Sequence, residues 1–583
     1  MVRLLGYLKT IKKPVIAAMI FAVVSQLGSL VLPLMMSSII NNGIANGDID
    51  YIKEMGIYMM LVSALAVVVA FFNSFYSSKT ATSYGKILRR ALFLKVESLS
   101  QSDIDIVGTP SLITRCTNDV KVLQDFVLMG LRMIISAPVM LVGGVIMAFT
   151  MNPKLASVIF GVLPIIAIIV VIVLKVVMPI FRRRQKLVDS INRFVREKLT
   201  GIRVIRAFNR TEHEDERFQK QNVELSSLTL RFQRLMSVLI PVCIVIIIAA
   251  LDLLIIFAAK NLDKMDVVTQ RDELANSIGN LQAFVIYMIM IVFSVTMAAA
   301  MFVIVPRAKI SAKRIVQVLD IEPSITEPES PESIDESKKG EVEFRNVTFR
   351  YLESEEPILS DVSFTAEKNK VTAIIGCTGS GKSSLINLIP RFYDVNEGQV
   401  LFDGVDVRKL SQKDLHSRIG YIPQKAFLFS GTIEDNLRYG DMDASEQELE
   451  KALEIAQCDF VGELEGGMKA FVSQNATNFS GGQKQRLSIA RALARKAEVY
   501  VFDDSFSALD FKTDAALRKA IKENLDATVI IVAQRVGTIL DADKIVVLEG
   551  GKVVGCGKHS ELLESCDVYK EIYSSQITEE DDV

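Results

Sequence analysis

The sequence has almost no net charge and few cysteines. Its 583 residues include 66 basic and 68 acidic side chains, a formal net charge of −2, so the composition gives no support for nucleic acid as the main partner. The cysteines show neither C-x-x-C nor zinc-ligand spacing. We interpret them as free thiols, in a reducing compartment or in the bilayer, and not as a disulfide framework. They are Cys116, Cys243, Cys377, Cys458, Cys556 and Cys566.

The N-terminus also lacks the features of a signal peptide, which would show a short apolar core and a small-residue cleavage site. Residues 1–13 are basic and lead into an apolar run that continues past Pro14 to about Ile40, long enough to cross a bilayer. Hydrophobic residues make up 50% of the chain and the mean hydropathy is +0.32. A membrane portion is therefore expected.

Long apolar runs fill the chain up to residue 320. Each has the ~20 residues that a membrane-spanning helix needs, so the sequence predicts one transmembrane helix for each run. Basic residues lie before the first run and after the second and fourth, which places both termini in the cytoplasm. The six predicted spans are 14–40, 55–76, 127–150, 155–181, 236–259 and 281–306.

Asp252 lies within the fifth predicted span, where a carboxylate is costly. Two interpretations stay open: it lines a substrate cavity or binds a cation, or it lies close enough to the outer interface to be hydrated. Lys175 lies near the inner end of the fourth span, where snorkelling of the side chain to the interface explains its presence.

The connections between the spans differ on the two sides of the membrane. The outer ones are short, at 41–50, 151–154 and 260–276, and the two inner ones are long with helix-compatible patterning. Long helices continuing into the cytoplasm, with turns near 102–109 and 209–215, are predicted to carry two contact points toward a soluble domain. Disordered inner loops are the alternative, and the repeating apolar residues disfavour it.

A stretch rich in Pro, Glu and Ser then separates two halves of different composition, and we expect an exposed linker there. Beyond it, predicted strands alternate with helical segments, which is typical of an α/β nucleotide-binding domain. The predicted domains are a transmembrane domain at 1–320, a linker at 321–339 and a nucleotide-binding domain at 340–583.

The phosphate-binding pattern G-x-x-x-x-G-K-[ST] lies between a predicted strand at 371–375 and a predicted helix at 384–389. Backbone N–H groups wrap phosphates in such a loop, Lys382 reaches the β- and γ-phosphates, and the Ser383 hydroxyl is a ligand for Mg²⁺. A chance glycine-rich turn is the alternative, which the order of strand, loop and helix disfavours. The predicted ATP-binding residues here are Gly376, Cys377, Thr378, Gly379, Ser380, Gly381, Lys382, Ser383 and Ser384.

A second motif decides the class of nucleotide-binding protein. Asn478-Phe479-Ser480-Gly481-Gly482-Gln483 resembles the signature L-S-G-G-Q of the ATP-binding cassette (ABC) family, with Phe479 in place of leucine. In that family the signature clasps the ATP held by the other nucleotide domain of a dimer. The resemblance covers nearly the whole chain and implies an exporter-type half-transporter. A half-transporter of this kind has a six-helix transmembrane domain of the type I ABC exporter, followed by an α/β P-loop domain, and the resemblance implies this fold for the chain.

The resemblance implies roles for further residues. Tyr351 matches the aromatic residue that stacks on adenine, although an ordinary core or surface tyrosine is the alternative. Gln424 matches the glutamine that touches Mg²⁺ and contacts the transmembrane domain. Asp503 matches the carboxylate that holds Mg²⁺, and Asp510 ends the loop that crosses the dimer interface. The implied cofactors are ATP and Mg²⁺.

The chain departs from the family at its own catalytic positions. Asp504 stands where the family has a glutamate that polarises the attacking water, and Gln534 stands where it has a histidine that contacts the γ-phosphate. A carboxylate shortened by one methylene and an amide that cannot become cationic both weaken catalysis. Ser480 to Gln483, which serve the partner's ATP, are intact. We therefore predict a degenerate site in a heterodimer; tolerated drift in a homodimer with slow ATPase is the alternative.

The resemblance as a whole predicts ATP-driven efflux of amphipathic drugs or lipids across an inner or plasma membrane. The expected partners are a second half-transporter subunit, membrane lipid and a small amphipathic substrate. Two alternatives stay open: a homodimeric lipid or peptide exporter, and an ATP-binding regulatory or channel subunit with little turnover.

Overall fold

The structure is a computed structural model that describes residues 1–151, 153–262, 271–334, 339–352 and 354–580. It divides into two compact units. The first comprises Met1–Glu97 and Pro110–Asp320, and the second comprises Ser98–Thr109 and Ile321–Val583.

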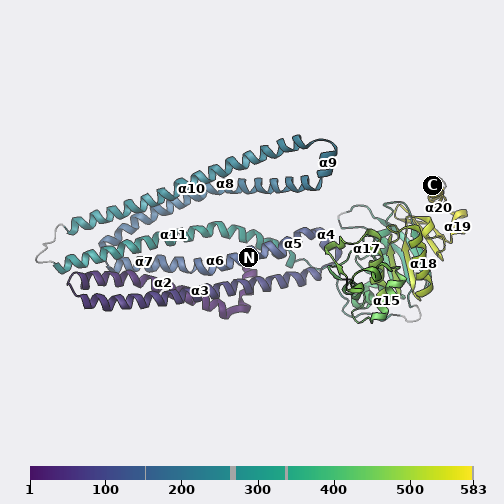
Figure 1. The fold of residues 1–583 in the computed structure, drawn as a ribbon, viewed down its shortest axis with the longest axis horizontal. Coiled ribbons are helices and arrows are strands. Elements are labelled where there is room, and N and C mark those ends of the chain that lie inside the picture. The colour runs from purple at the N-terminus through teal and green to yellow at the C-terminus, as the bar shows by residue number, and fades with distance from the viewer. Residues whose placement is uncertain (152, 263–270, 335–338, 353, 581–583) are drawn as a thin grey trace. The chain divides into compact units, whose positions relative to one another are not determined.

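The described residues of the first unit are helical (Figure 1). Helix α3 packs along α2, α11 packs along α7, and α8 and α10 run side by side with α9 joining their ends. The helices are α1 Val2–Leu5, η1 Gly6–Ile11, α2 Lys12–Ser38, η2 Ile39–Ile44, α3 Ile49–Glu97, α5 Thr109–Thr114, η3 Arg115–Asp119, α6 Val120–Met129, η4 Gly130–Ile134, α7 Ser136–Met151, α8 Pro153–Thr200, α9 Ile202–Ala207, α10 Thr211–Leu262 and α11 Arg271–Leu319.

Within the described residues, 4 helical stretches are long and apolar enough to cross a membrane: Val2–Ile44, Ile49–Glu97, Thr109–Met151 and Ile278–Ala298. They contain most of the predicted first, second, third and sixth spans. The predicted fourth and fifth spans fall in α8 and α10, where many of the side chains lie outside the described residues. Part of the predicted outer connection at 260–276 also lies outside them, and Asp252 and Lys175 are both exposed in α10 and α8.

The long inner connections are helical over most of their length, so disordered inner loops are not what the structure has. The first of the two predicted turns contains α4, Gln101–Val107, which groups with the second unit. Ser100 caps this helix by accepting a hydrogen bond from the Asp103 backbone. The second predicted turn follows α9, where Val204 and Phe208 are 60% and 74% exposed. Its contact with a soluble domain stays a prediction.

The described residues of the second unit form three sheets around buried apolar cores. The largest has the order β12-β11-β3-β10-β9-β6, and all its neighbouring pairs except β11 with β12 are parallel. Its strands are β3 Val371–Ile375, β6 Ile419–Ile422, β9 Val499–Asp503, β10 Thr528–Val532, β11 Lys544–Glu549 and β12 Lys552–Gly557. Every residue of β9 and β10 is buried, as expected for parallel strands covered on both faces.

Smaller elements complete the second unit. An antiparallel sheet has the order β2-β1-β4-β5 and a two-stranded sheet pairs β7 with β8. Their bounds are β1 Val342–Phe349, β2 Leu359–Ala366, β4 Glu397–Phe402, β5 Val405–Asp406, β7 Gly431–Thr432 and β8 Phe471–Val472. The helices are α12 Lys382–Asn387, η6 Val407–Lys409, α13 Gln412–Ser417, α14 Ile433–Arg438, α15 Glu446–Ile455, α16 Phe460–Glu463, η7 Gly467–Lys469, η8 Gln474–Ala476, α17 Gly481–Ala494, α18 Phe511–Asn524, η9 Val536–Thr538, α19 His559–Ser565 and α20 Asp567–Glu580.

Parallel pairing brings the carboxyl ends of β3, β9 and β10 to one edge of the large sheet. Val532 in β10 pairs with Asp503 on one side and with Ile374 on the other. Loops that follow parallel strands at such an edge form the binding site in open α/β sheets. The phosphate loop, Asp504 and Gln534 are therefore neighbours although they lie far apart in the sequence.

Asp403, in the turn between β4 and β5, carries a fully buried carboxyl group. Its Oδ1 accepts hydrogen bonds from the backbone N–H groups of Gly340 (2.6 Å) and Glu341 (2.9 Å), and Oδ2 is buried with no partner among the described residues. Burial raises the pKa of this carboxyl to about 7. The unfolded chain loses this proton near pH 3.8, so folding stability falls as pH rises from there to about 7.

The substitution Asp403→Asn is expected to stabilise the protein at neutral and higher pH, because the amide keeps the acceptor and never ionises. Asparagine also tolerates the φ of 50° at this position. We expect a gain on the order of 1–2 kcal/mol above pH 7 that disappears near pH 4. Thermal unfolding of the purified chain in detergent, measured across this pH range, checks it; a gain that does not depend on pH would contradict the account.

Candidate functional site

The phosphate loop connects β3 to α12, and its backbone conformation requires glycine at two positions. A Cβ atom at Gly376 would lie 2.1 Å from the carbonyl oxygen of Leu548, and Gly381 has a φ of 97°. Cys377, Thr378 and Gly379 are exposed at the tip of the loop. The loop thus offers backbone N–H groups at an accessible helix N-terminus, which suits a phosphate chain.

Lys382 folds back onto this loop. Its Nζ donates hydrogen bonds to the carbonyl oxygens of Gly376 (2.7 Å) and Cys377 (2.9 Å), and burial lowers its pKa. The buried hydroxyl of Ser380 has no partner among the described residues. An unpartnered hydroxyl and a desolvated ammonium group both gain from a polyanionic ligand. These residues therefore fit a nucleoside phosphate.

Ser383 and Asp503 lie side by side. The Ser383 hydroxyl donates a hydrogen bond of 3.1 Å to Oδ1 of Asp503. Burial raises the pKa of Asp503, and the neighbouring charge of Asp504 raises it further. A hydroxyl and a carboxylate at this distance are a donor set that suits Mg²⁺, which would also relieve the cost of the buried charge.

Asp504 follows β9 in a left-handed conformation, with a φ of 46°, and its side chain is buried. Its Oδ2 accepts two amide hydrogen bonds, one from Nε2 of Gln534 (2.7 Å) and one from Nε2 of Gln424 (3.0 Å). The structure therefore places Gln424 against Asp504, and its side-chain hydrogen bond goes there and not to the pair of Ser383 and Asp503. Two glutamines from two other loops thus meet at a single carboxylate oxygen of Asp504.

The loop that carries Gln534 is held by a residue that the sequence analysis missed. Gln576 of α20 accepts a hydrogen bond from the Val536 backbone N–H (2.7 Å) and donates one to the Gln534 carbonyl (2.8 Å). Both partners lie about 40 residues upstream, and no spacing pattern links a glutamine in a terminal helix to this loop.

We expect Gln576→Glu to loosen this loop. The carboxylate keeps the acceptor for Val536 but replaces the donor to Gln534 with a second oxygen, so one hydrogen bond is lost and two oxygens face each other. Deuterium exchange of the peptide that carries Val536 should become about five- to tenfold faster. Glu571→Gln, at an exposed position of α20, is the matched control. Unchanged exchange in Gln576→Glu would show that the pair does not hold the loop.

Tyr351 belongs to a cluster of aromatic rings. Its ring packs edge-on against Phe349 at 5.0 Å and against Tyr393 at 5.2 Å, and its hydroxyl lies 3.1 Å from that of Ser384. The cluster borders a cleft of about 520 Å³ that also contains Arg350 and Asn396. This volume is ample for a nucleotide base. Tyr393 is a further residue of this cleft that the sequence did not reveal.

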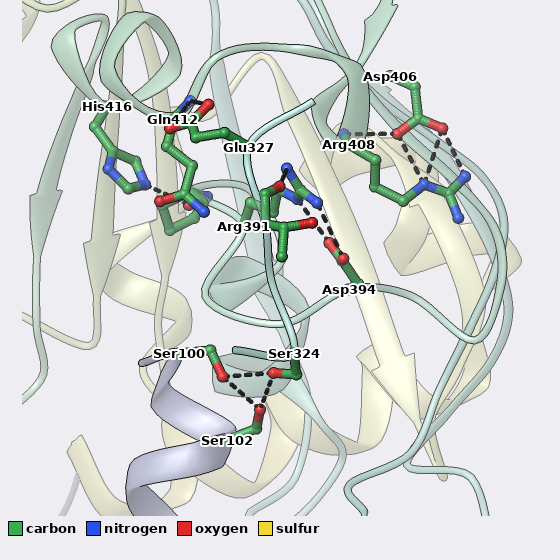
Figure 2. A network of polar contacts seen from close by, with 12 residues as sticks. Ser100, Ser102, Ser324, Glu327, Arg391, Asp394, Asp406, Arg408, Gln412 and His416 are labelled. Atoms are coloured by element: carbon green, nitrogen blue, oxygen red, sulfur yellow. Dashed lines mark hydrogen bonds and ion pairs between the residues drawn. The ribbon is translucent and has the colours of Figure 1, made fainter. Parts of the chain in front are cut away.

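Helix α4 and the predicted linker border the same cleft, and Figure 2 shows the polar contacts between them. The Ser324 hydroxyl lies 2.6 Å from that of Ser100 and 3.0 Å from that of Ser102, and its backbone N–H donates to Asp103. The Tyr393 hydroxyl donates a hydrogen bond of 3.0 Å to Asp105. The helix is thus fastened both to the linker and to the aromatic cluster beside Tyr351.

The linker itself is fastened at further points. Both carboxylate oxygens of Glu327 accept from the Gln412 backbone N–H at 3.2 Å, and Arg391 donates to the Thr326 carbonyl at 3.4 Å. Arg391 Nε lies 2.8 Å from Oδ1 of Asp394, and Figure 2 shows this pair next to the linker. Residues 321–334 have no helix or strand, and these bonds hold them to the second unit.

The signature residues form the start of α17. Ser480 and Gln483 make a reciprocal capping box, with Gln483 Oε1 accepting from the Ser480 N–H (2.9 Å) and Ser480 Oγ accepting from the Gln483 N–H (3.3 Å). Gly481 and Gly482 form the first turn. Asp510 caps α18 by accepting from the backbone and hydroxyl of Thr513. None of the described hydrogen bonds joins Ser480–Gln483 to the phosphate loop.

Comparison with known proteins identifies the arrangement. Residues 15–295 match the ABC transporter transmembrane region and residues 359–507 match the ABC transporter domain. An uncharacterized ABC transporter ATP-binding protein of Mycobacterium tuberculosis is 38% identical over 98% of this chain and 97% of its own length. The chain belongs to the ABC transporter family. The ATP-dependent lipid A-core flippase of Haemophilus influenzae is 29% identical to this ABC transporter, over 99% of the chain and 97% of the flippase.

A solved structure of a bacterial Atm1-family ABC exporter with ATP bound has a TM-score of 0.77 with this ABC transporter, at 21% identity, and covers 97% of this chain and 98% of the other. The predicted fold class, a type I ABC exporter, is confirmed. The chain is a multi-pass protein of an inner or plasma membrane, with a cytoplasmic nucleotide-binding domain. ABC exporters bind ATP, couple its hydrolysis to transport and function as dimers, and relatives of this length are half-transporters.

Proposed function

We propose that this chain is the degenerate-site subunit of a heterodimeric ABC exporter of amphipathic compounds, drugs or lipids. The observation that carries the proposal is the carboxylate of Asp504, whose Oδ2 accepts hydrogen bonds from two glutamine amides. A general base must direct a free lone pair at the water it activates. Both amide donors occupy lone pairs of Oδ2, and the short side chain holds the group close to the strand end.

Gln534 adds to this weakness. Its Nε2 is engaged with Asp504 at 2.7 Å, and an amide carries no positive charge to stabilise charge that develops on phosphate. Because Gln576 also fixes the backbone of its loop, we infer that Gln534 holds Asp504 in place more than it senses a phosphate. The two residues that depart from the family, Asp504 and Gln534, are thus hydrogen-bonded to each other.

The remainder of the site supports retention of nucleotide. Tyr351 would stack on the adenine, Lys382 and the loop N–H groups would hold the phosphates, and Ser383 and Asp503, with Gln424, would hold Mg²⁺. Mg²⁺, when bound, neutralises negative charge on the phosphate oxygens. Because the carboxylate at the base position is short and engaged, and the cationic residue is absent, we propose that this site binds ATP tightly and hydrolyses it slowly.

The start of α17 supports a role in a second, competent site. Ser480 is held by its capping box, and Ser480 and Gly481 are exposed at the positive end of the helix dipole. We propose that Ser480 to Gln483 contact the γ-phosphate of ATP bound to a different subunit. That subunit would supply the glutamate and histidine that this chain lacks.

Transport into inside-out membrane vesicles tests the proposal. Vesicles that contain this chain together with its partner subunit should accumulate an amphipathic fluorescent dye or lipid when ATP is added, and vesicles that contain this chain alone should not. Accumulation by this chain alone would favour the homodimeric exporter. No accumulation with any co-expressed cassette subunit, despite ATP binding, would favour a regulatory or channel subunit.

A further inference from the structure

Arg132 lies within the predicted third transmembrane span, at 127–150, and it is the only Asp, Glu, Lys or Arg in that span. It belongs to η4, a short π-helical turn between α6 and α7. π-Helical turns inside longer helices occur frequently at functional sites. A charged side chain at such a position is costly in a membrane and calls for a specific partner.

The partners of Arg132 in the structure are neutral. Its Nη2 donates to the hydroxyl of Ser74 (2.7 Å), the hydroxyl of Ser78 (3.1 Å) and the carbonyl of Ser74 (3.4 Å), all on α3. Its Nε is buried without a hydrogen bond, and no carboxylate lies within ion-pair distance of it in the described part of the chain. Among the described residues, only hydroxyl and carbonyl dipoles therefore compensate this positive charge.

Other basic residues of the same unit differ in this respect. Arg314 lies 3.8 Å from Asp119, and Arg183 lies 2.8 Å from Glu224. If the only role of Arg132 were to link η4 to α3, a neutral donor such as an amide could make the same hydrogen bonds. It would do so without the desolvation cost of a full charge. The guanidinium group has instead retained a full charge and an Nη1 without a hydrogen bond among the described residues, which an anion from outside the chain would satisfy.

The surroundings of Arg132 combine this charge with exposed apolar surface on α3. Ser74 is exposed and Arg132 is half-buried, so the group is open on one side. Phe71 and Phe75 flank Ser74 and are 65% and 50% exposed. A molecule with an anionic group and an apolar body would meet hydrogen-bond donors and aromatic surface at the same place.

We propose that Arg132, with Ser74 and Ser78, forms a subsite for the phosphate or carboxylate group of an amphipathic substrate, whose apolar part lies against Phe71 and Phe75. This inference rests on the proposed export function and adds the substrate class, an amphipathic anion. The two hydroxyls hold the guanidinium group in place through Nη2, which leaves Nη1, without a hydrogen bond among the described residues, for the anion.

A tryptophan reporter tests the subsite directly, because the sequence contains no tryptophan. The variant Phe75→Trp, placed in phosphatidylcholine vesicles, would carry a single fluorophore beside Ser74. Phosphatidylglycerol with brominated acyl chains should quench it more strongly than brominated phosphatidylcholine does. When Arg132→Gln is added to this variant, the apparent affinity for phosphatidylglycerol, measured from the quenching, should fall about tenfold, because a charge-assisted hydrogen bond is lost.

Two further variants make the result decisive. Arg132→Lys keeps the charge and should keep the preference for the anionic lipid, and Lys175→Gln, which removes the cation of the fourth span, should not alter it. Relief of quenching by inorganic phosphate would assign the subsite to the phosphate group itself, and no relief would assign it to the lipid-borne group. Equal quenching by both lipids, or an unchanged preference in a folded Arg132→Gln protein, would overturn the proposal.

The quenching assay uses neither ATP nor turnover, so it separates this inference from the proposed function. If the reporter protein shows the preference for anionic lipid but vesicles with this chain and its partner subunit transport neither dye nor lipid, the result would count against the export proposal alone. Normal transport of neutral compounds in Arg132→Gln, without anion preference in the parent reporter, would count against the subsite alone.

Discussion

The double variant Asp504→Glu with Gln534→His is expected to hydrolyse ATP about 100-fold faster than the unmodified chain, because a positioned general base alone contributes at least this factor. The longer glutamate reaches past the two amides that now hold Oδ2 of Asp504. The histidine removes one of those amides and supplies a group that becomes cationic. Phosphate release by the purified protein, at saturating ATP, measures the effect.

The single variants are the controls for this gain. Asp504→Glu alone leaves the Gln534 amide in place and should recover only part of the rate, and Gln534→His alone leaves the short carboxylate. The gain should therefore be larger than the two single gains combined, as expected for groups that share one network. A double variant that binds ATP and turns over no faster than the unmodified chain would contradict the degenerate-site proposal.

Gly481→Asp is expected to lower ATP turnover of the assembled heterodimer at least 100-fold, although it lies far in sequence from the phosphate loop of its own chain. A Cβ at Gly481 meets nothing within 4 Å, so the substitution does not disturb the fold. It places a carboxylate at the N-terminus of α17, where the partner's γ-phosphate is proposed to lie. Repulsion between two anions opposes closure of that site.

Gly462→Asp is the matched control, because a Cβ there also meets nothing within 4 Å and the position is exposed on α16. It should leave turnover unchanged. Asp504→Asn in the same heterodimer should lower turnover less than twofold, since the chain's own site contributes little. If Gly481→Asp and Asp504→Asn had equal effects, the two sites would be equivalent and the asymmetry would be wrong.

Much of the candidate site follows from the sequence because strand order brings it together. The phosphate loop, Asp503 and Gln534 each follow a short apolar run that the sequence marks as a buried strand, and parallel strand ends meet at one edge. The residue types at these positions then carry the chemistry. Their adjacency in the structure required no information beyond local patterns and the resemblance to a family.

The contacts that tertiary packing creates were not predictable in this way. Gln576 lies on α20, and nothing in its local sequence links it to Gln534. Tyr393 and Asp105 are 288 residues apart and meet only because α4 packs with the second unit. Arg132 carried a usable signal, a charge inside a predicted span, but its dependence on Ser74 required the packing of α3 against η4.

The most direct test of the central claim is the ATP turnover of this chain purified alone in detergent, with its oligomeric mass measured on the same sample. The account predicts little or no turnover, together with ATP binding, and recovery of turnover when a second cassette subunit is co-expressed. Brisk hydrolysis by a dimer of this chain alone would mean that Asp504 and Gln534 suffice for catalysis, and the heterodimer proposal would be wrong.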